Sequence, residues 1–143
     1  GALSLIENKP NEAFFVMNAD LLTDVNFSHL LDFHSFSNSD ATMCVREYEY
    51  QVPYGVIEVE ESNVTSIVEK PIQKFFVNAG IYVLSPKVFD YIPKNEFYDM
   101  PTLFNTFIEK EKKVISFPIH EYWLDIGRLE EYKKANEEYE NIF

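Results

Sequence analysis

Short apolar runs alternate with segments of helical periodicity along this chain, and this alternation limits its fold more than any other feature. Residues 13–18 and 41–48 are typical of strands, whereas residues 26–37 repeat their apolar side chains every three or four positions. Further strand-like segments follow at 75–84, 114–119 and 122–126, and further helical ones at 86–91, 101–112 and 128–140. The pattern predicts an α/β domain, with a mixed, mostly parallel sheet and helices on both of its faces.

A pattern typical of a β-hairpin interrupts the alternation. Residues 54–60 and 64–69 both alternate apolar and polar side chains, and the residues between them favour a turn. We expect a small β insertion here, inside one domain portion that spans residues 1–143.

Each helical segment has an apolar stripe that predicts its buried face. The first, with Asp24 or Asn26 as cap, is expected to bury Phe27, Leu30, Leu31 and His34. The later two are expected to bury Leu103, Phe104, Phe107 and Ile108, and Leu129, Tyr132, Asn136 and Tyr139. Residues 13–18 form a continuous apolar run, which predicts a strand buried on both faces.

Composition excludes some classes of partner. The net charge of −12 argues against a nucleic-acid surface, since phosphate backbones need a basic face. It permits small phosphorylated ligands, because a divalent cation can bridge them to an acidic protein. No apolar run approaches the roughly 20 residues of a membrane span. The single cysteine, Cys44, lies in a strand-like run and is expected to be buried, in a protein of the reducing cytoplasm.

Two aspartates follow aromatic-rich apolar runs. Asp20 ends Phe14–Asp20, and Asp125 follows Tyr122-Trp123-Leu124. A carboxylate at the carboxyl end of a strand stands where open α/β sheets place their ligands, and two such groups on neighbouring strands could hold one divalent metal. Asp20 could instead cap a helix or shape a turn, and Asp125 could be a helix-end anion.

Other polar positions around the hairpin could contact a ligand. Gly55, after Tyr54, would allow a ligand to approach closely, although an ordinary strand entry after Pro53 explains this glycine more simply. Lys70 could pair with a phosphate and Glu69 with sugar hydroxyls, or the two could form a solvated ion pair. Asn78 stands in an apolar run, so we expect it to be buried and to need hydrogen-bond partners, from either a ligand or a bulge in the sheet.

The order of these motifs resembles that of the sugar-phosphate nucleotidyltransferases, the guanylyl-, thymidylyl- and uridylyltransferases that make nucleotide sugars. The matching stretches are G-A-L-S, F-V-M-N-A-D-L-L-T-D, V-P-Y-G-V-I, V-E-K-P, N-A-G-I-Y-V and W-L-D-I-G-R-L-E-E-Y, which cover nearly the whole chain. The resemblance implies a Rossmann-like sheet with a β insertion over the sugar.

The resemblance also implies roles for individual residues. Asp20 and Asp125 would hold a catalytic Mg²⁺, and Lys70 would meet the sugar-1-phosphate. The sugar would be contacted by Tyr54, Gly55, Glu69 and Asn78. Gly1 would end a nucleotide-facing stretch of the family.

The implied reaction is in-line attack of a sugar-1-phosphate oxygen on the α-phosphorus of a nucleoside triphosphate, with pyrophosphate as the leaving group. Residues 43–48 and 51–55 favour the guanylyltransferase branch, and so GTP. Two departures are Ala19, where many relatives have glycine, and Arg128, an extra cation without an assigned role.

The family's glycine-rich triphosphate loop is absent from the chain. We therefore interpret the chain as the C-terminal part of a nucleotidyltransferase domain, inactive in isolation, which self-associates through the surface that truncation exposes. Two other hypotheses stay open. One is a non-catalytic nucleotidyltransferase-like regulatory or interaction domain, and the other is a metal-dependent glycosyltransferase that uses Asn18-Ala19-Asp20 as a degenerate D-x-D motif.

Overall fold

The computed structural model describes residues 2–127 and 129–142, so the expectations for Gly1 and Arg128 lie outside the described residues. Its elements are, in order, η1 (Ala2–Leu5), β1 (Phe14–Met17), β2 (Leu21–Thr23), α1 (Phe27–Phe36), β3 (Ala41–Gln51), β4 (Val56–Glu60), β5 (Asn63–Val68), β6 (Ile72–Leu84), η2 (Pro86–Asp90), α2 (Met100–Glu109), β7 (Val114–Pro118), β8 (Trp123–Asp125) and α3 (Leu129–Ile142). Residues 46–77 form one compact unit, unit 2, and the remainder forms unit 1.

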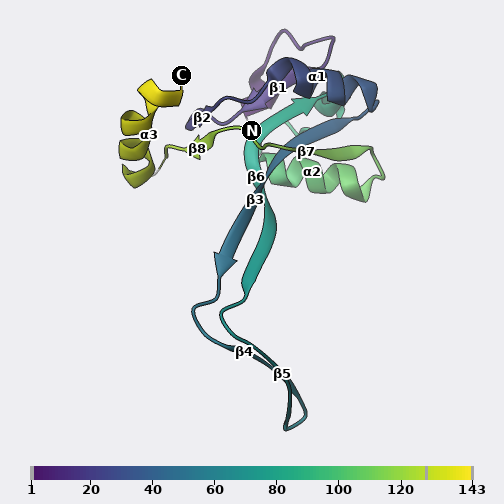
Figure 1. The fold of residues 1–143 in the computed structure, drawn as a ribbon. Helices are drawn as coiled ribbons and strands as arrows, with labels where there is room; N and C mark the ends of the chain where they lie inside the picture. The colour runs from purple at the N-terminus through teal and green to yellow at the C-terminus, as the bar shows by residue number, and fades with distance from the viewer. Residues whose placement is uncertain (1, 128, 143) are drawn as a thin grey trace. The chain divides into compact units, whose positions relative to one another are not determined.

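A four-stranded mixed sheet in the order β1-β6-β3-β7 is the centre of unit 1 (Figure 1). The edge strand β1 pairs with β6 in antiparallel orientation, with Phe14 opposite Leu84. The other edge strand, β7, pairs with β3 in parallel orientation, with Ala41 opposite Val114. The predicted α/β class and mixed sheet are therefore confirmed. One edge pairing is antiparallel and the other parallel, so these pairings do not show the parallel majority that we expected.

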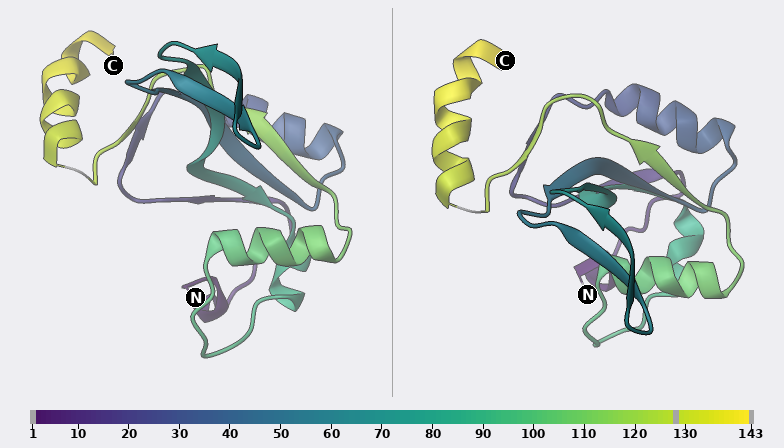
Figure 2. Two further views of the ribbon diagram at one scale, coloured as in Figure 1. Left: turned by 90° about the horizontal axis from the view of Figure 1, so that it is seen from below. Right: turned by 60° about the horizontal axis from the view of Figure 1, so that its bottom comes forward.

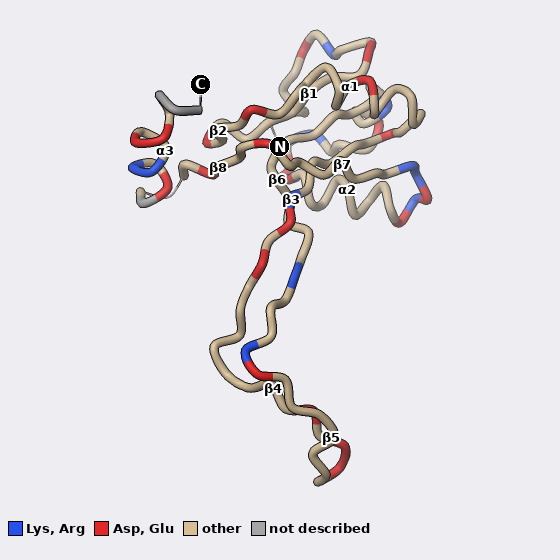
Figure 3. Tube along the Cα trace, viewed as in Figure 1, with Lys and Arg blue, Asp and Glu red and all other residues tan. Residues whose placement is uncertain are grey.

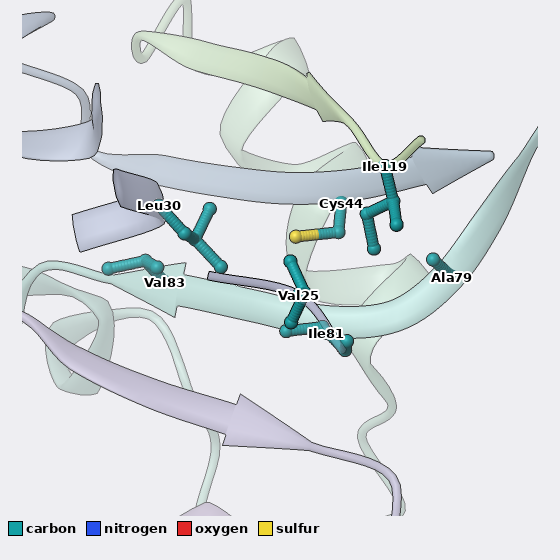
Figure 4. Packing of buried hydrophobic residues seen from close by; sticks show 7 residues of the cluster. All are labelled: Val25, Leu30, Cys44, Ala79, Ile81, Val83 and Ile119. Atoms are coloured by element: carbon teal, nitrogen blue, oxygen red, sulfur yellow. The ribbon is translucent and has the colours of Figure 1, made fainter. Parts of the chain in front are cut away.

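Successive side chains of β6 point to opposite faces of the sheet and enter two separate cores. Ile81 and Val83 pack with Leu30 of α1 and with Cys44, as Figure 4 shows. Tyr82 and Leu84 instead join the buried side chains of α2, which are Leu103, Phe104 and Phe107. Helices α1 and α2 thus cover opposite faces of the sheet (Figure 2), as the sequence predicted.

Each of these two helices begins at a side-chain cap. The Asn26 side chain accepts the His29 N–H at 3.0 Å, which confirms one of the two expected caps of α1. Asp99 caps α2 in the same way, accepting the Thr102 N–H at 2.9 Å. Hydrogen bonds from the side chain and the backbone of Thr102 lower the pKa of Asp99. A carboxylate here also complements the positive end of the helix dipole.

Cys44 is buried in the core, as expected. Burial, reinforced by the charge of Glu121, raises the pKa of its thiol to about 12. The thiolate, which is the reactive form of cysteine, is therefore scarce at neutral pH.

Four expectations about burial are wrong. On α1, Leu30 and His34 are buried as expected, but Phe27 is 38% exposed. β1 is not buried on both faces, because it is an edge strand, and Phe15 and Met17 are 38% and 39% exposed. On α2, Ile108 is 60% exposed and lies at the edge of the expected stripe. The face expected to be inward on α3 is exposed at Leu129, Tyr132, Asn136 and Tyr139, and Ala135 is buried instead. Among the described elements, α3 has its main contact with β8, a three-residue strand that is too short to cover a 14-residue helix.

Unit 2 contains the hairpin β4–β5 and the adjoining parts of β3 and β6. The hairpin pairs Ile57 with Ile67, and its register shifts between Glu58 and Val59. In the rest of the unit, the Lys74 ammonium lies 3.0 Å from Glu47 and 2.6 Å from Glu49. Acidic positions predominate along the unit, as they do along α3 (Figure 3). The expected β insertion is therefore present.

Among residues 2–127 and 129–142, no helix is both long enough and apolar enough to cross a membrane.

A buried polar contact joins α1 to β3. His34 is 3% exposed and Thr42 is fully buried, and their Nδ1 and Oγ1 atoms share a hydrogen bond of 2.8 Å. Burial lowers the pKa of His34 from its ordinary value, and the nearby charge of Asp40 opposes this shift only in part. The native state thus favours the neutral imidazole.

Acidification should therefore destabilise unit 1 through His34. Because the pKa of His34 is lowered in the folded state, the unfolded chain binds more protons below pH 6.5 than the folded chain does. The contribution of the neutral His34 to stability is therefore full above pH 6.5, and it is lost as the pH falls from 6.5 toward the lower pKa of the folded state. Urea unfolding at a series of pH values checks this. The variant His34→Gln should lose that part of the pH dependence, whereas the control His29→Gln should keep it; equal profiles for all three proteins would contradict the prediction.

Removing the Thr42 hydroxyl should also lower the stability of the folded state. Thr42→Val keeps the shape of the side chain but leaves the buried His34 Nδ1 without its partner, which should lower the free energy of unfolding by about 1–3 kcal/mol. The control Thr65→Val, at an exposed strand position, should change it by less than about 0.5 kcal/mol. Equal urea midpoints for the two variants would refute this role of the hydroxyl.

Candidate active site

The pairing of two short strands brings Asp20 and Asp125 together. Asp20 directly precedes β2, and Asp125 is the last residue of β8. These strands pair in antiparallel orientation with Leu21 opposite Asp125, so the start of one lies beside the end of the other. The Ile126 N–H donates to the Asp20 carbonyl at 2.8 Å, which extends this pairing past the strands.

The strands that carry the two aspartates differ from those expected. We expected each aspartate to end a buried strand, but three residues separate β1 from β2, and Asp20 lies in that interval. β8 is also not part of the four-stranded sheet, because it pairs with β2 in a separate two-stranded sheet. The proximity of the carboxylates therefore depends on a pairing between segments about a hundred residues apart in sequence.

Gly127 provides the space in which the two carboxylates converge. A Cβ atom at this position would lie 2.8 Å from Asp20 Oδ2 and 3.1 Å from Asp125 Oδ1. Any larger residue would displace Asp20, so glycine permits both oxygens to approach one point. The Gly127 N–H also donates to Asp125 Oδ1 at 2.9 Å, which orients that carboxylate. Both aspartates are exposed and accessible to a ligand.

The donor chemistry of this carboxylate pair fits Mg²⁺. The described residues contain no group of three or more His, Cys, Asp or Glu side chains arranged to hold a metal ion. Mg²⁺ does not need such a group, since one or two carboxylates commonly bind it together with waters and substrate phosphates. Two converging hard oxygens, Asp20 Oδ2 and Asp125 Oδ1, meet that requirement.

The segment Asn78-Ala79-Gly80 connects the carboxylate pair to the four-stranded sheet. Trp123, in β8, donates from Nε1 to the Ala79 carbonyl at 2.8 Å. The Asn18 N–H donates to the Gly80 carbonyl at 2.9 Å. Gly80 has a φ of +72°, and the Asn18 side chain occupies the space that a Cβ there would need, 2.8 Å away. These contacts hold both ends of the β2–β8 pair against β6.

Asn78 is exposed, contrary to the expectation that it is buried. Its partners are nevertheless within β6, since Oδ1 accepts the Gly80 N–H and Nδ2 donates to Tyr82 Oη, both at 2.8 Å. The amide oxygen can accept a second hydrogen bond and the amide nitrogen can donate a second one, so Asn78 can still form a hydrogen bond with a ligand hydroxyl. Burial raises the pKa of the Tyr82 phenol, so this hydroxyl stays protonated.

A cavity of about 430 Å³ opens beside Asn78 in unit 1. Its lining combines apolar and hydrogen-bonding side chains from η1, β1, β6 and the start of α2, namely Ala2, Leu3, Val16, Asn18, Asn78, Tyr82, Tyr98, Asp99, Met100 and Pro101. We call it the first cavity. Amide, phenol and carboxylate groups suit the hydroxyls of a sugar ring. Sequence reasoning missed Tyr98 and Asp99, although an aspartate directly before a helical apolar stripe is a recognisable signal for an N-terminal cap.

The other four predicted residues lie together in unit 2, at the base of the hairpin. Val56 and Val68 form the first pair of β4 and β5, so Tyr54-Gly55 and Glu69-Lys70 lie side by side. The Lys70 N–H donates to the Tyr54 carbonyl at 3.2 Å. Gly55 again provides space, because a Cβ there would lie 3.0 Å from Glu69 Oε2.

Lys70 and Glu69 are not engaged with each other. Within the described part of the chain neither forms an ion pair, so the solvated-pair interpretation finds no support. Lys70 also has a φ of +45°, an uncommon conformation for a residue with a side chain. Both side chains are exposed and available for a ligand.

Comparisons with known proteins agree with these motifs. The profile of the family described as "Nucleotidyl transferase" matches residues 2–142. A mannose-1-phosphate guanyltransferase of Yarrowia lipolytica is 34% identical over 92% of this chain, which spans 38% of that relative's length. The chain thus spans less than half of that curated relative.

Two solved structures share the fold. A Bacillus anthracis protein described as a glucose-1-phosphate thymidylyltransferase, in complex with a sucrose, has a TM-score of 0.68 at 20% identity, over 95% of this chain and 58% of its own. HddC from Yersinia pseudotuberculosis, complexed with GMP-PN, has a TM-score of 0.59 at 28% identity, over 96% of this chain and 59% of its own. With the family profile matching almost its whole length, this chain belongs to the nucleotidyl transferase family.

Proposed function

We propose that this chain is the metal- and sugar-phosphate-binding part of a Mg²⁺-dependent sugar-1-phosphate nucleotidyltransferase. The parent activity joins a hexose-1-phosphate to a nucleoside triphosphate and yields a nucleotide sugar and pyrophosphate. The observation that carries the proposal is the convergence of Asp20 and Asp125 over Gly127. Membership of the nucleotidyl transferase family supports the reaction class.

The reaction needs positioning and charge neutralisation more than proton transfer. A phosphate oxygen of the sugar-1-phosphate forms a bond to the α-phosphorus of the triphosphate, and the bond from that phosphorus to the bridging oxygen breaks, so pyrophosphate takes the electron pair. Mg²⁺, when bound by Asp20 and Asp125, would neutralise phosphate charge. Asp20 Oδ2 and Asp125 Oδ1 lie 2.8 Å and 3.1 Å from the position that a Cβ of Gly127 would take. A metal ion between them would mark the place where a phosphate can bind to a chain of net charge −12.

Each unit by itself offers candidate ligands for a sugar-1-phosphate. Lys70 supplies the cation for its phosphate, and Glu69, beside Gly55, accepts hydrogen bonds from its hydroxyls. In unit 1, Asn78 and the first cavity offer further partners to a sugar ring. Tyr54 would add an exposed aromatic face at the base of the hairpin.

GTP is the nucleotide that we propose. The segments 43–48 and 51–55 favour it, and two of the similar proteins are a guanyltransferase and HddC complexed with GMP-PN. We further propose that the chain binds metal and sugar phosphate but does not complete the transfer alone, since its four glycines, at positions 1, 55, 80 and 127, are too far apart in sequence for a glycine-rich phosphate-binding loop.

β1 is an edge strand among the residues that the structure describes, and this supports the proposal that copies of the chain associate. β1 ends the strand order of the sheet, and Phe15 and Met17 are partly exposed on it. An apolar edge strand readily pairs with another chain. Sedimentation should therefore show a concentration-dependent dimer, which Met17→Lys weakens. A monomer at every concentration would count against this association.

Metal binding should depend on both carboxylates and on Gly127. Replacing Asp20 or Asp125 with Asn, or Gly127 with Ala, should weaken Mn²⁺ binding by about tenfold or more, because each change removes or displaces a ligand oxygen. Mn²⁺ titration followed by water proton relaxation measures this in the chain as it stands. The control Asp32→Asn, on an exposed position of α1, should bind like the parent, and equal binding by all variants would exclude this metal site.

The proposed nucleotidyltransferase activity should be measurable in the longest natural chain that contains residues 1–143. With Mg²⁺, GTP and a hexose-1-phosphate it should release pyrophosphate, and Asp20→Ala or Lys70→Ala should lower kcat/KM by about a hundredfold or more, since each removes charge neutralisation at the phosphates. The matched control Lys74→Ala, which removes a neighbouring cation that pairs with Glu47 and Glu49, should have little effect. A folded chain that releases no pyrophosphate with any pairing would disprove the enzyme, and a biological role unaffected by Asp20→Ala would favour a regulatory domain.

A further inference from the structure

A second cavity adjoins the first in unit 1. Its volume is about 470 Å³, and it shares Asn78 and Pro101 with the first cavity. Its other lining residues come from β3, α2 and β7, so it extends from the first cavity across the α2 face of the sheet. None of the residues used above for metal or phosphate lines it.

The lining of this second cavity is apolar with a few neutral polar groups. On β3 and β7, Met43 lies opposite Ser116, and Val114 is two residues before it on the same face. Phe104 and Ile108 of α2 complete the apolar part, and Asn105 adds an amide. No acidic or basic side chain lines the cavity.

We propose that the second cavity receives an acylamino substituent on the sugar ring, so that the substrate class is the N-acyl hexosamine 1-phosphates. This inference rests on the proposed function, because it assumes that the ring occupies the first cavity. With the sugar ring beside Asn78 in the first cavity, an acylamino group on the ring extends past Asn78 and Pro101, which line both cavities, into the second cavity. The acyl methyl group then contacts Met43 and Ile108, and the amide reaches Asn105 or Ser116.

The lining distinguishes this substituent from the alternatives. A free ammonium group would lose its water without gaining a carboxylate, because the cavity has no acidic residue. A plain hydroxyl would leave most of the apolar lining in water. An acylamino group supplies both an apolar end and a neutral amide, which match the two kinds of side chain present.

The proposal can be tested by measuring how tightly residues 1–143 bind four sugar 1-phosphates. Calorimetry with Mg²⁺ would compare N-acetylglucosamine 1-phosphate with glucose 1-phosphate, and N-acetylmannosamine 1-phosphate with mannose 1-phosphate. In at least one of the two series, the N-acetyl sugar should bind about tenfold more tightly than the unsubstituted one, as expected for one buried methyl group with its amide.

A filled cavity should abolish this preference. Ser116→Trp places an indole in the second cavity from an exposed strand position, so the fold should tolerate it, and it should bring the N-acetyl sugars to the affinity of the unsubstituted ones. Ser35→Trp, an exposed position of α1 outside both cavities, is the matched control and should keep the preference. Circular dichroism would verify that both variants are folded.

The outcomes separate this inference from the proposed function. If hexose-1-phosphates bind without a preference for the acyl group, or if Ser116→Trp leaves that preference intact, the assignment of the second cavity is wrong and the proposed function stands. If no hexose-1-phosphate binds, both fail.

Discussion

The antiparallel pairing of β2 with β8 is the interaction on which the candidate active site depends. Both strands have only three residues, and two such strands alone would not be stable in water. The hydrogen bond from Trp123 to the Ala79 carbonyl, together with that from Asn18 to Gly80, holds the pair against β6. Because residues 79–84 of β6 are buried between two helices, the position of the carboxylates depends on the packed core.

Glycine has the same role at three separate points of the chain. At Gly127 it leaves room for Asp20, at Gly55 for Glu69, and at Gly80 for Asn18. In each case a polar side chain occupies the space that a Cβ would take. The two groups of candidate ligand residues, one in each unit, are therefore built by the same device, in which backbone without a side chain lets a polar group approach closely.

Much of the fold could be predicted from the sequence, because its signals are local. Apolar periodicity identified α1, α2 and the strands of the sheet, and Asn26 indicated where α1 begins. Predictions about exposure were weaker. Phe15, Ile108 and Tyr132 are apolar and follow the expected periods, yet they are exposed, because burial depends on which elements lie opposite them and how far those elements extend.

The sequence by itself determined the identity of the candidate ligand residues and the family, since both are carried by residue types in a fixed order. The tertiary structure alone decided that Asp20 and Asp125 meet, that Gly127 leaves their oxygens room, and that Asp99 and Tyr98 line a cavity with Asn78. Those facts depend on the pairing of segments about a hundred residues apart and on packing around β6, and neither the spacing nor the chemistry of single residues specifies such long-range contacts.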